Sequence, residues 1–527
     1  MTPDPGTVPE TERRASEGDA VRFLLWIAAG FALAPVVVPF GFLVGRAASG
    51  GSKALDTVLS GRTIELMVST LLLVAIVSIS AATIGVGAAW LTERTDLTGR
   101  KWWRVVVALP LVMPSYVIAL TIISALGPRG LLSDLFGFGF PTVRGLVGAW
   151  WALTAATYPF VYLIVASAMR RIDPALEEAA RGLGLSPNRV FTRVVLPQLR
   201  QPIGAGVLLA ALYALSDFGA VSLVGFDSFT NVIYAQYAGR LDRTPAMVLA
   251  VMLVVLALGV MWTAGRLRRE RQFVPRPVTR PTRLMSLSRA QRTGGYAALS
   301  LVAMGSLGLP VATLVTWLIR KPFPDGVPWG SLAGSLSASL LAATVAVLLA
   351  IPTAVLIVRH RSRASAWVER TAYLAYSVPH ITVGLAVVFL ASRYLGSLYQ
   401  SLWLLVAVYA SVFFAQALGA VRSALAQISP SLEEAARSLG KGPLRVMTGI
   451  TLPLMGRGIA AGGLLVFLTT MKELPVTLLT RPIGFDTLAV DVWSAAGELL
   501  YSSAAVPALL LLVVSALPIY VLATRQL

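Results

Sequence analysis

The sequence predicts an all-α polytopic membrane protein with about twelve transmembrane helices, and three observations lead to this fold class. Apolar residues make up 56% of the 527 residues and charged residues only 13%, whereas a soluble fold has about 25% charged residues. Long apolar stretches recur, and roughly 20 apolar residues are enough to cross a bilayer. The formal charge is +19, and in so apolar a chain this basic excess indicates membrane orientation rather than nucleic-acid binding.

Twelve apolar stretches are long enough to span a bilayer, and they fall into two sets of six. The first set covers residues 22–44, 64–91, 104–126, 145–168, 203–224 and 246–265. The second set covers residues 296–319, 333–358, 372–395, 401–421, 458–480 and 503–524. Several contain Gly or Pro, which membrane helices tolerate when neighbours satisfy the freed backbone groups. Residues 1–20 are polar and are expected to form a disordered cytoplasmic tail.

The distribution of basic residues predicts the orientation of these spans. If the N-terminus is cytoplasmic, 32 of the 44 Lys and Arg residues fall on the inner side and 12 on the outer side. Cytoplasmic loops of membrane proteins carry such an excess. We therefore expect both termini on the cytoplasmic side. The chain has no cysteine and only two histidines, which excludes thiolate metal sites and a histidine-based metal centre, so no stable metal site is expected.

The chain is a tandem repeat. Residues 173–200 and 429–456 are identical at 15 of 28 positions, and each segment follows the fourth span of its half. Six spans per half is an even number, so the halves have the same orientation and should be related by a pseudo-twofold axis along the membrane normal. The halves are expected at 21–265 and 296–527, joined by a basic cytoplasmic linker at 266–295.

The repeated segment has the features of two short helices on the inner surface. In the first copy Pro174 and the acidic pair Glu177 and Glu178 favour a helix start, and Gly184 interrupts the helix. Such a segment could lie flat on the membrane as an amphipathic anchor. Two near-identical copies on one side instead indicate two matching docking sites for a symmetric partner.

The repeated segment resembles the signature loop of permeases of binding-protein-dependent ABC importers. The residues that carry the resemblance in the first loop are Glu177, Glu178, Ala179, Ala180, Gly184, Val194, Leu196 and Pro197. In the second loop they are Glu433, Glu434, Ala435, Ala436, Gly440, Ile450, Leu452 and Pro453. The resemblance implies the type I ABC importer permease fold, in which each loop is a coupling helix seated in a cytoplasmic ATPase. Glu178 and Glu434 would contact the ATPase, and the two glycines would form turns.

The resemblance also implies the partners. The chain has no phosphate-binding G-x-x-x-x-G-K-[ST] loop, so ATP and Mg are expected on a separate ATPase and the chain is not expected to be an enzyme. Two ATPase copies would serve the fused halves, and an extracytoplasmic substrate-binding protein would deliver the substrate. The expected location is the bilayer of a bacterial cytoplasmic membrane, with no nucleic-acid partner.

Two further segments, 216–237 and 471–493, resemble ferric iron permeases, which implies Fe³⁺ as the substrate. Thiamine or another small solute remains an alternative, as does an ion-gradient-driven secondary transporter, although the latter does not explain the doubled loops. Intramembrane acids usually face a bundle interior, so Asp217 and Glu473 are candidates for oxygen contacts along the path. The alternative is that each caps a helix break.

Four further residues remain to be placed. Asp227, Asp486 and Asp491 are expected in outward loops, where they could receive the binding protein or guide the cation. Ordinary solvated acids are the alternative. His380 aligns with Ser115 and is expected to be packed or hydrogen-bonded rather than a ligand.

Overall fold

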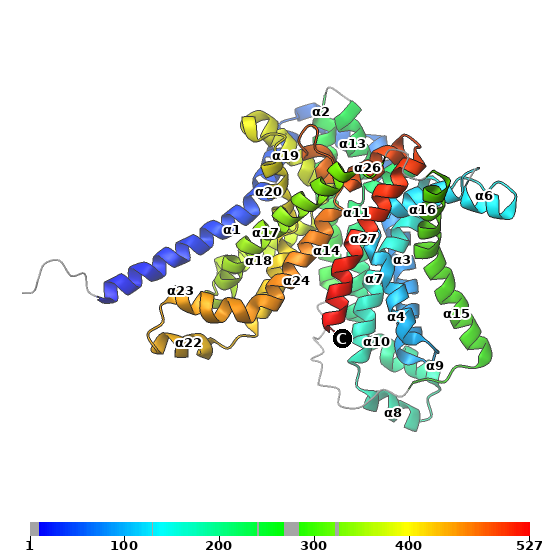
Figure 1. Cartoon of the computed structure of the whole chain (residues 1–527), viewed down its shortest axis with the longest axis horizontal. Helices are drawn as coiled ribbons and strands as arrows, with labels where there is room; N and C mark the ends of the chain where they lie inside the picture. Colours follow the sequence, from blue (N-terminus) through cyan, green and yellow to red (C-terminus); the bar gives the residue numbers. More distant parts are fainter. Residues whose placement is uncertain (1–9, 129, 240–241, 268–283, 322–325, 527) are drawn as a thin grey trace, which may run out of the picture.

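The computed structural model describes residues 10–128, 130–239, 242–267, 284–321 and 326–526, and Figure 1 shows their arrangement. The helices of the first half are α1 (Glu10–Ala48), α2 (Gly51–Leu59), α3 (Gly61–Arg94), α4 (Arg100–Ala108), η1 (Leu109–Val112), α5 (Ser115–Ala125), α6 (Leu131–Phe136), α7 (Gly145–Arg170), α8 (Pro174–Gly182), α9 (Pro187–Val190), η2 (Phe191–Val195), α10 (Leu196–Gln198), α11 (Arg200–Ser216), α12 (Gly219–Leu223), α13 (Phe229–Gly239) and α14 (Thr244–Leu267).

The second half repeats this order. Its helices are α15 (Arg289–Ala303), η3 (Met304–Gly308), α16 (Leu309–Arg320), α17 (Trp329–Arg359), α18 (Arg363–Ser377), α19 (His380–Tyr394), η4 (Gly396–Leu398), α20 (Leu402–Val412), α21 (Phe414–Ala426), α22 (Pro430–Ser438), α23 (Pro443–Val446), η5 (Met447–Thr451), α24 (Leu452–Met471), α25 (Pro475–Thr480), α26 (Leu488–Gly497) and α27 (Tyr501–Gln526). The described residues contain no strand beyond an isolated bridge between Thr95 and Met285, so the all-α fold class is confirmed.

Seven described helices are long and apolar enough to cross a membrane, or eleven if each bent pair of helices counts as one span. The remaining expected span, 503–524, falls within α27. The spans expected at 104–126 and 372–395 are not straight, because their two helical parts meet at angles of 96° and 102°. Each bend lies at a proline, Pro114 or Pro379, which lacks the N–H that would continue a helix.

Described residues within the expected tail and linker are partly helical. Helix α1 begins at Glu10, so the second part of the tail, expected to be disordered, is helical; residues 1–9 lie outside the described part. Of the linker, 268–283 also lies outside it. Its last residues, 289–295, belong to α15, whose N-terminus is capped reciprocally by Ser288 and Gln291, a capping box that starts a helix.

Small residues let the long helices approach closely. A Cβ on Gly85 of α3 would lie 2.7 Å from Val161 of α7, and a Cβ on Gly206 of α11 would lie 2.7 Å from the same residue. In the second half, Gly458 and Gly462 of α24 pack in the same way against alanines of α21. Because lipid is as apolar as a leucine side chain, such close backbone packing is what holds membrane helices together.

The two halves exchange their first helices. Helix α1 packs against α17, α19 and α20 of the second half, and Figure 1 shows it beside them. Ser411 of α20 donates a hydrogen bond to the carbonyl of Ala32 in α1. In return, α16 of the second half packs on α5, where Trp317 donates to the hydroxyl of Ser124. The helices that pack together in space therefore do not all belong to the same half of the sequence.

Candidate translocation path and coupling loops

The two repeated loops form the short helices α8 and α22 at one end of the molecule (Figure 1). Asp173 caps α8 by accepting a hydrogen bond from the backbone N–H of Ala175 at 2.9 Å, and Ser429 caps α22 in the same way. Both helices end before a glycine with positive φ, +82° at Gly184 and +80° at Gly440. Only glycine adopts this conformation without steric cost, which confirms the turns expected there.

The first glutamate of each loop faces inward. The guanidinium of Arg94, at the end of α3, lies 3.0 Å from the Glu177 carboxylate, and the two side chains are only 6% and 9% exposed. Arg359, at the end of α17, holds Glu433 at 3.1 Å. Glu177 and Glu433 belong to the residues expected to couple the loops to the ATPase. Both carboxylates are buried and tie the loop to a long helix.

The same arginines also anchor the backbone ahead of each loop. Arg94 donates to the carbonyl of Met169 at 2.8 Å, and Arg359 donates to the carbonyl of Ile428 at 3.1 Å. Sequence reasoning missed both arginines. Their equivalent positions could have identified them, because each arginine follows the second long apolar stretch of its half.

The second glutamate of each loop faces outward. Glu178 and Glu434 are exposed, and at the C-terminal end of each short helix stands a highly exposed leucine, Leu183 at 84% and Leu439 at 82%. Of the two alanines in each loop, Ala179 and Ala435 are exposed, whereas Ala180 and Ala436 are buried. Each loop therefore presents an acid and an apolar side chain at the surface.

A widened helical turn leads from each loop into the next span. The π turns η2 and η5 directly precede Leu196-Pro197 and Leu452-Pro453. A proline cannot donate to the carbonyl one turn before it, and a π turn is one way in which a helix accommodates that interruption. The Leu-Pro pairs therefore lie at the start of the helix that follows each π turn.

The two candidate path acids lie at matching helix breaks. Helix α11 ends at Ser216 and α24 ends at Met471, and a short helix follows each break. Asp217 accepts a backbone N–H from Ala220 at 2.9 Å, and Glu473 accepts one from Val476 at 3.2 Å. In this conformation each acid caps the short helix that follows, as the alternative reading of these residues anticipated.

Each path acid has a side-chain partner at the bend of the neighbouring span. Ser115 donates a hydrogen bond to the Asp217 carboxylate. Nδ1 of His380 lies 2.8 Å from a Glu473 oxygen, so His380 is hydrogen-bonded as expected. The repeat aligns Ser115 with His380 and Asp217 with Glu473, and the structure makes the equivalent contact in each half, Ser115 with Asp217 and His380 with Glu473.

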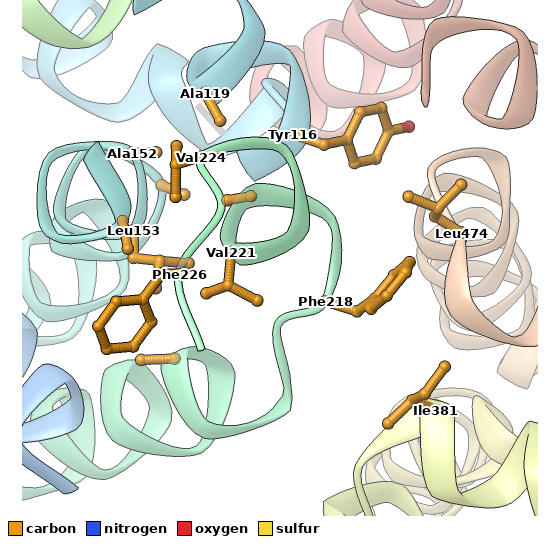
Figure 2. Close-up of a cluster of buried hydrophobic side chains, with 14 of the residues drawn as sticks. Tyr116, Ala119, Ala152, Leu153, Phe218, Val221, Val224, Phe226, Ile381 and Leu474 are labelled. Atoms are coloured by element: carbon orange, nitrogen blue, oxygen red, sulfur yellow. The ribbon is translucent and has the colours of Figure 1, made fainter. Parts of the chain in front are cut away.

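Apolar side chains from both halves meet between the two breaks. Figure 2 shows Phe218 and Tyr116 of the first half facing Leu474 and Ile381 of the second, within one buried cluster. The backbone approach is close, because a Cβ on Gly219 would lie 2.8 Å from Tyr116 and 3.2 Å from Leu474. These side chains fill the space between the halves at the level of the breaks.

Lys472 adds a polar link across the same boundary. Its ammonium group donates to the carbonyl of Leu111 in η1 of the other half at 3.0 Å. It lies next to Glu473 in sequence, and its side chain is half-buried. A basic side chain inside a membrane bundle is costly unless it has a function or a partner. Sequence reasoning assigned no role to this residue.

The candidate outer-mouth acids lie near α13 and α26, at the end of the molecule opposite α8 and α22 (Figure 1). Asp227 and Asp486 occupy loops as expected, and each is paired with an arginine, Arg62 and Arg481 respectively. Asp491 is not in a loop, because it lies in the first turn of α26. An acid is favoured there by the positive end of the helix.

Comparison with known proteins agrees with this architecture. Residues 81–272 and 326–525 each match the family described as binding-protein-dependent transport system inner membrane component. The Fe(3+)-transport system permease protein FbpB 2 of Haemophilus influenzae is 30% identical over 498 residues, which is 93% of this chain and 95% of that protein.

Other relatives match only part of the chain. A probable molybdenum ABC transporter permease protein of Haloferax volcanii is 32% identical over 249 residues, 46% of this chain and 88% of that protein. The sulfate transport system permease protein CysW of Synechocystis is 31% identical over 192 residues, 34% of this chain and 70% of that protein. The family match occurs once in each half, as the tandem repeat requires. The chain belongs to the family of binding-protein-dependent transport system inner membrane components.

Proposed function

We propose that this chain is the transmembrane permease of an ATP-driven importer, and that it carries ferric iron delivered by an extracytoplasmic binding protein. The assignment of ferric iron as the substrate rests on the 30% identity, over nearly the whole of both chains, to an Fe(3+)-transport system permease. The paired loops α8 and α22 support the coupling to ATP hydrolysis. The membrane is the cytoplasmic membrane of a bacterium, with both loops and both termini on the inner side.

Two copies of one ATPase dock on α8 and α22 and bind the ATP and Mg²⁺. Leu183 and Leu439 supply exposed apolar anchors, and Glu178 and Glu434 supply exposed charges in the same loops. Docking would bury these two leucine side chains, and burial of apolar surface contributes favourably to association. Movement of the ATPases reaches the long helices α3 and α17 through the buried ion pairs Arg94–Glu177 and Arg359–Glu433.

The path opens where α11 and α24 are broken. In alternating access, the side chains packed between the halves separate, and the path becomes accessible from one side at a time. Asp217 and Glu473 then offer oxygen atoms to Fe³⁺, since a hard cation prefers oxygen ligands. Because both carboxylates are already engaged by Ser115 and His380, their contacts with the ion are weak and transient, as passage requires.

A second candidate substrate is an oxyanion. Molybdenum and sulfate permeases match 46% and 34% of the chain, and Lys472 places a cationic group at the boundary between the halves. Iron and oxyanions make opposite demands on this residue, since a cation is repelled by the ammonium group and an anion is attracted to it.

The decisive experiment reconstitutes the chain in vesicles with its ATPase and binding protein and follows uptake of labelled iron, molybdate, sulfate and thiamine. We expect ATP-dependent uptake of iron alone, and we expect the double substitution D217N/E473Q to lower it at normal protein levels. Uptake of another solute instead of iron would make that solute the substrate and reject the assignment of iron. Uptake that is driven by an ion gradient without ATP rejects the importer.

A further inference from the structure

A groove of about 400 Å³ lies between α4 and the segment formed by α15 and η3. This volume is in the range of ligand sites, about 300–1,000 Å³. The side chains that line it are almost all apolar: Trp102, Trp103, Val106, Ser300, Ala303 and Met304. Trp102 is 72% exposed. The groove therefore opens onto the outside of the helix bundle, where the bilayer surrounds the protein.

A π turn gives the groove its upper wall. Helix α15 widens into η3 at Met304, and the carbonyl of Gly305 accepts a hydrogen bond from the indole N–H of Trp151 at 3.1 Å. A Cβ on Gly308 would lie 2.7 Å from the sulfur of Met304, so the methionine side chain lies close against the backbone of this turn. Such π turns inside helices are frequent at functional sites.

Polar contacts hold the two walls at the lower end of the groove. Arg292 of α15 forms a 3.0 Å ion pair with Asp96, and the hydroxyl of Tyr296 donates to the carbonyl of Thr98 at 2.9 Å. The segment that carries Asp96 and Thr98 directly follows Arg94, the residue bound to the first coupling loop. The lower end of the groove is thus in the leaflet that faces the coupling loops.

Two basic residues begin the helix that forms one wall of the groove. Arg100 and Lys101 open α4 immediately before the two groove tryptophans. No side chain caps the N-terminus of α4, which leaves its partial positive charge available beside the two cations. The corresponding helix of the other half, α18, begins with Arg363, but its N-terminus is capped by Ser362.

We propose that this groove binds an anionic phospholipid of the leaflet facing the coupling loops. One acyl chain lies along Trp102, Trp103 and Met304, and the phosphate group lies beside Arg100 and Lys101. An apolar groove beside a helix that begins with two cations is complementary to an amphiphile with a negative head. Basic sites between membrane helices on this side are known to hold anionic lipid head groups.

The test is native mass spectrometry of the full permease with phosphatidylglycerol or phosphatidylcholine of identical acyl chains. We expect wild type to retain phosphatidylglycerol preferentially. The variant R100Q/K101Q should bind it about 30-fold more weakly, because each basic residue near the surface contributes ~1 kcal/mol. Excess inorganic phosphate should not displace the lipid, since the acyl chain supplies much of the binding.

A matched control removes equal charge elsewhere. R361Q/R363Q alters the exposed cations at the capped end of α18 and should leave retention unchanged. Trp102→Ala, at an exposed position, should weaken both lipids, and thermal melting checks that each variant folds. Equal retention of the two lipids by wild type, unchanged retention by R100Q/K101Q, or displacement by phosphate alone overturns the proposal.

Discussion

Of two adjacent glutamates in the first repeated loop, only one should change the stability of the loop when it is substituted. Glu177 is buried against Arg94 at 3.0 Å and also contacts Arg181 at 3.2 Å, whereas Glu178 is exposed. Substitution of Glu177 by Gln leaves the Arg94 guanidinium, 6% exposed, without its charged partner. Removal of one partner of a buried ion pair destabilises a fold by about 3–5 kcal/mol. Here the loss weakens the attachment of α8 to α3.

We therefore expect E177Q to loosen the loop and E178Q to leave it intact. Hydrogen exchange across residues 173–186 should rise in E177Q and stay at the wild-type level in E178Q. ATPase co-purification should fall in both variants, in the first because the docking element is displaced and in the second because a contact is lost. The second loop offers the same comparison between Glu433 and Glu434.

A double variant tests whether the effect of E177Q comes from the unpaired charge of Arg94 or from the changed loop sequence. R94M/E177M removes both charges, and replacement of a buried pair by apolar side chains is often neutral or stabilising. It should restore low hydrogen exchange in the loop. If E177Q exchanges like wild type, or if E178Q exchanges as fast as E177Q, the assignment of an inward and an outward glutamate is wrong.

Three other substitutions probe the turn, the link between the halves and the inner surface. Gly440→Ala forces a positive φ on a residue with a Cβ, which costs about 1–2 kcal/mol, so the melting temperature and ATPase binding should both fall. Lys472→Met removes the hydrogen bond to Leu111, and we expect higher basal ATP hydrolysis without substrate because the halves separate more readily; unchanged hydrolysis would show that this bond does not restrain them. Burial, together with two nearby arginines, lowers the pKa of His360 below its usual 6.5, so the unfolded chain binds more protons and stability should fall as the pH drops below about 6.5. His360→Gln should flatten that part of the profile of melting temperature against pH.

Much of the architecture could be predicted because its signals are local. A span is about 20 consecutive apolar residues, and a repeat of 28 positions is visible without any structure. The turns at Gly184 and Gly440 were predictable for the same reason, since a break in a short helix before glycine is a property of neighbouring residues. The bends at Pro114 and Pro379 also rest on local chemistry, although their angles do not follow from it.

The sequence by itself determined the all-α class, the apolar stretches long enough to span a membrane, the two repeated halves and the repeated loops that form α8 and α22. Only the tertiary structure decided which glutamate of each loop faces inward, which helix each half gives to the other, and that Asp217 and Glu473 cap short helices beside Ser115 and His380. The physical reason is distance along the chain. Periodicity and propensity act over a few residues, whereas a buried charge is paired by whichever residue the packed helices bring to it.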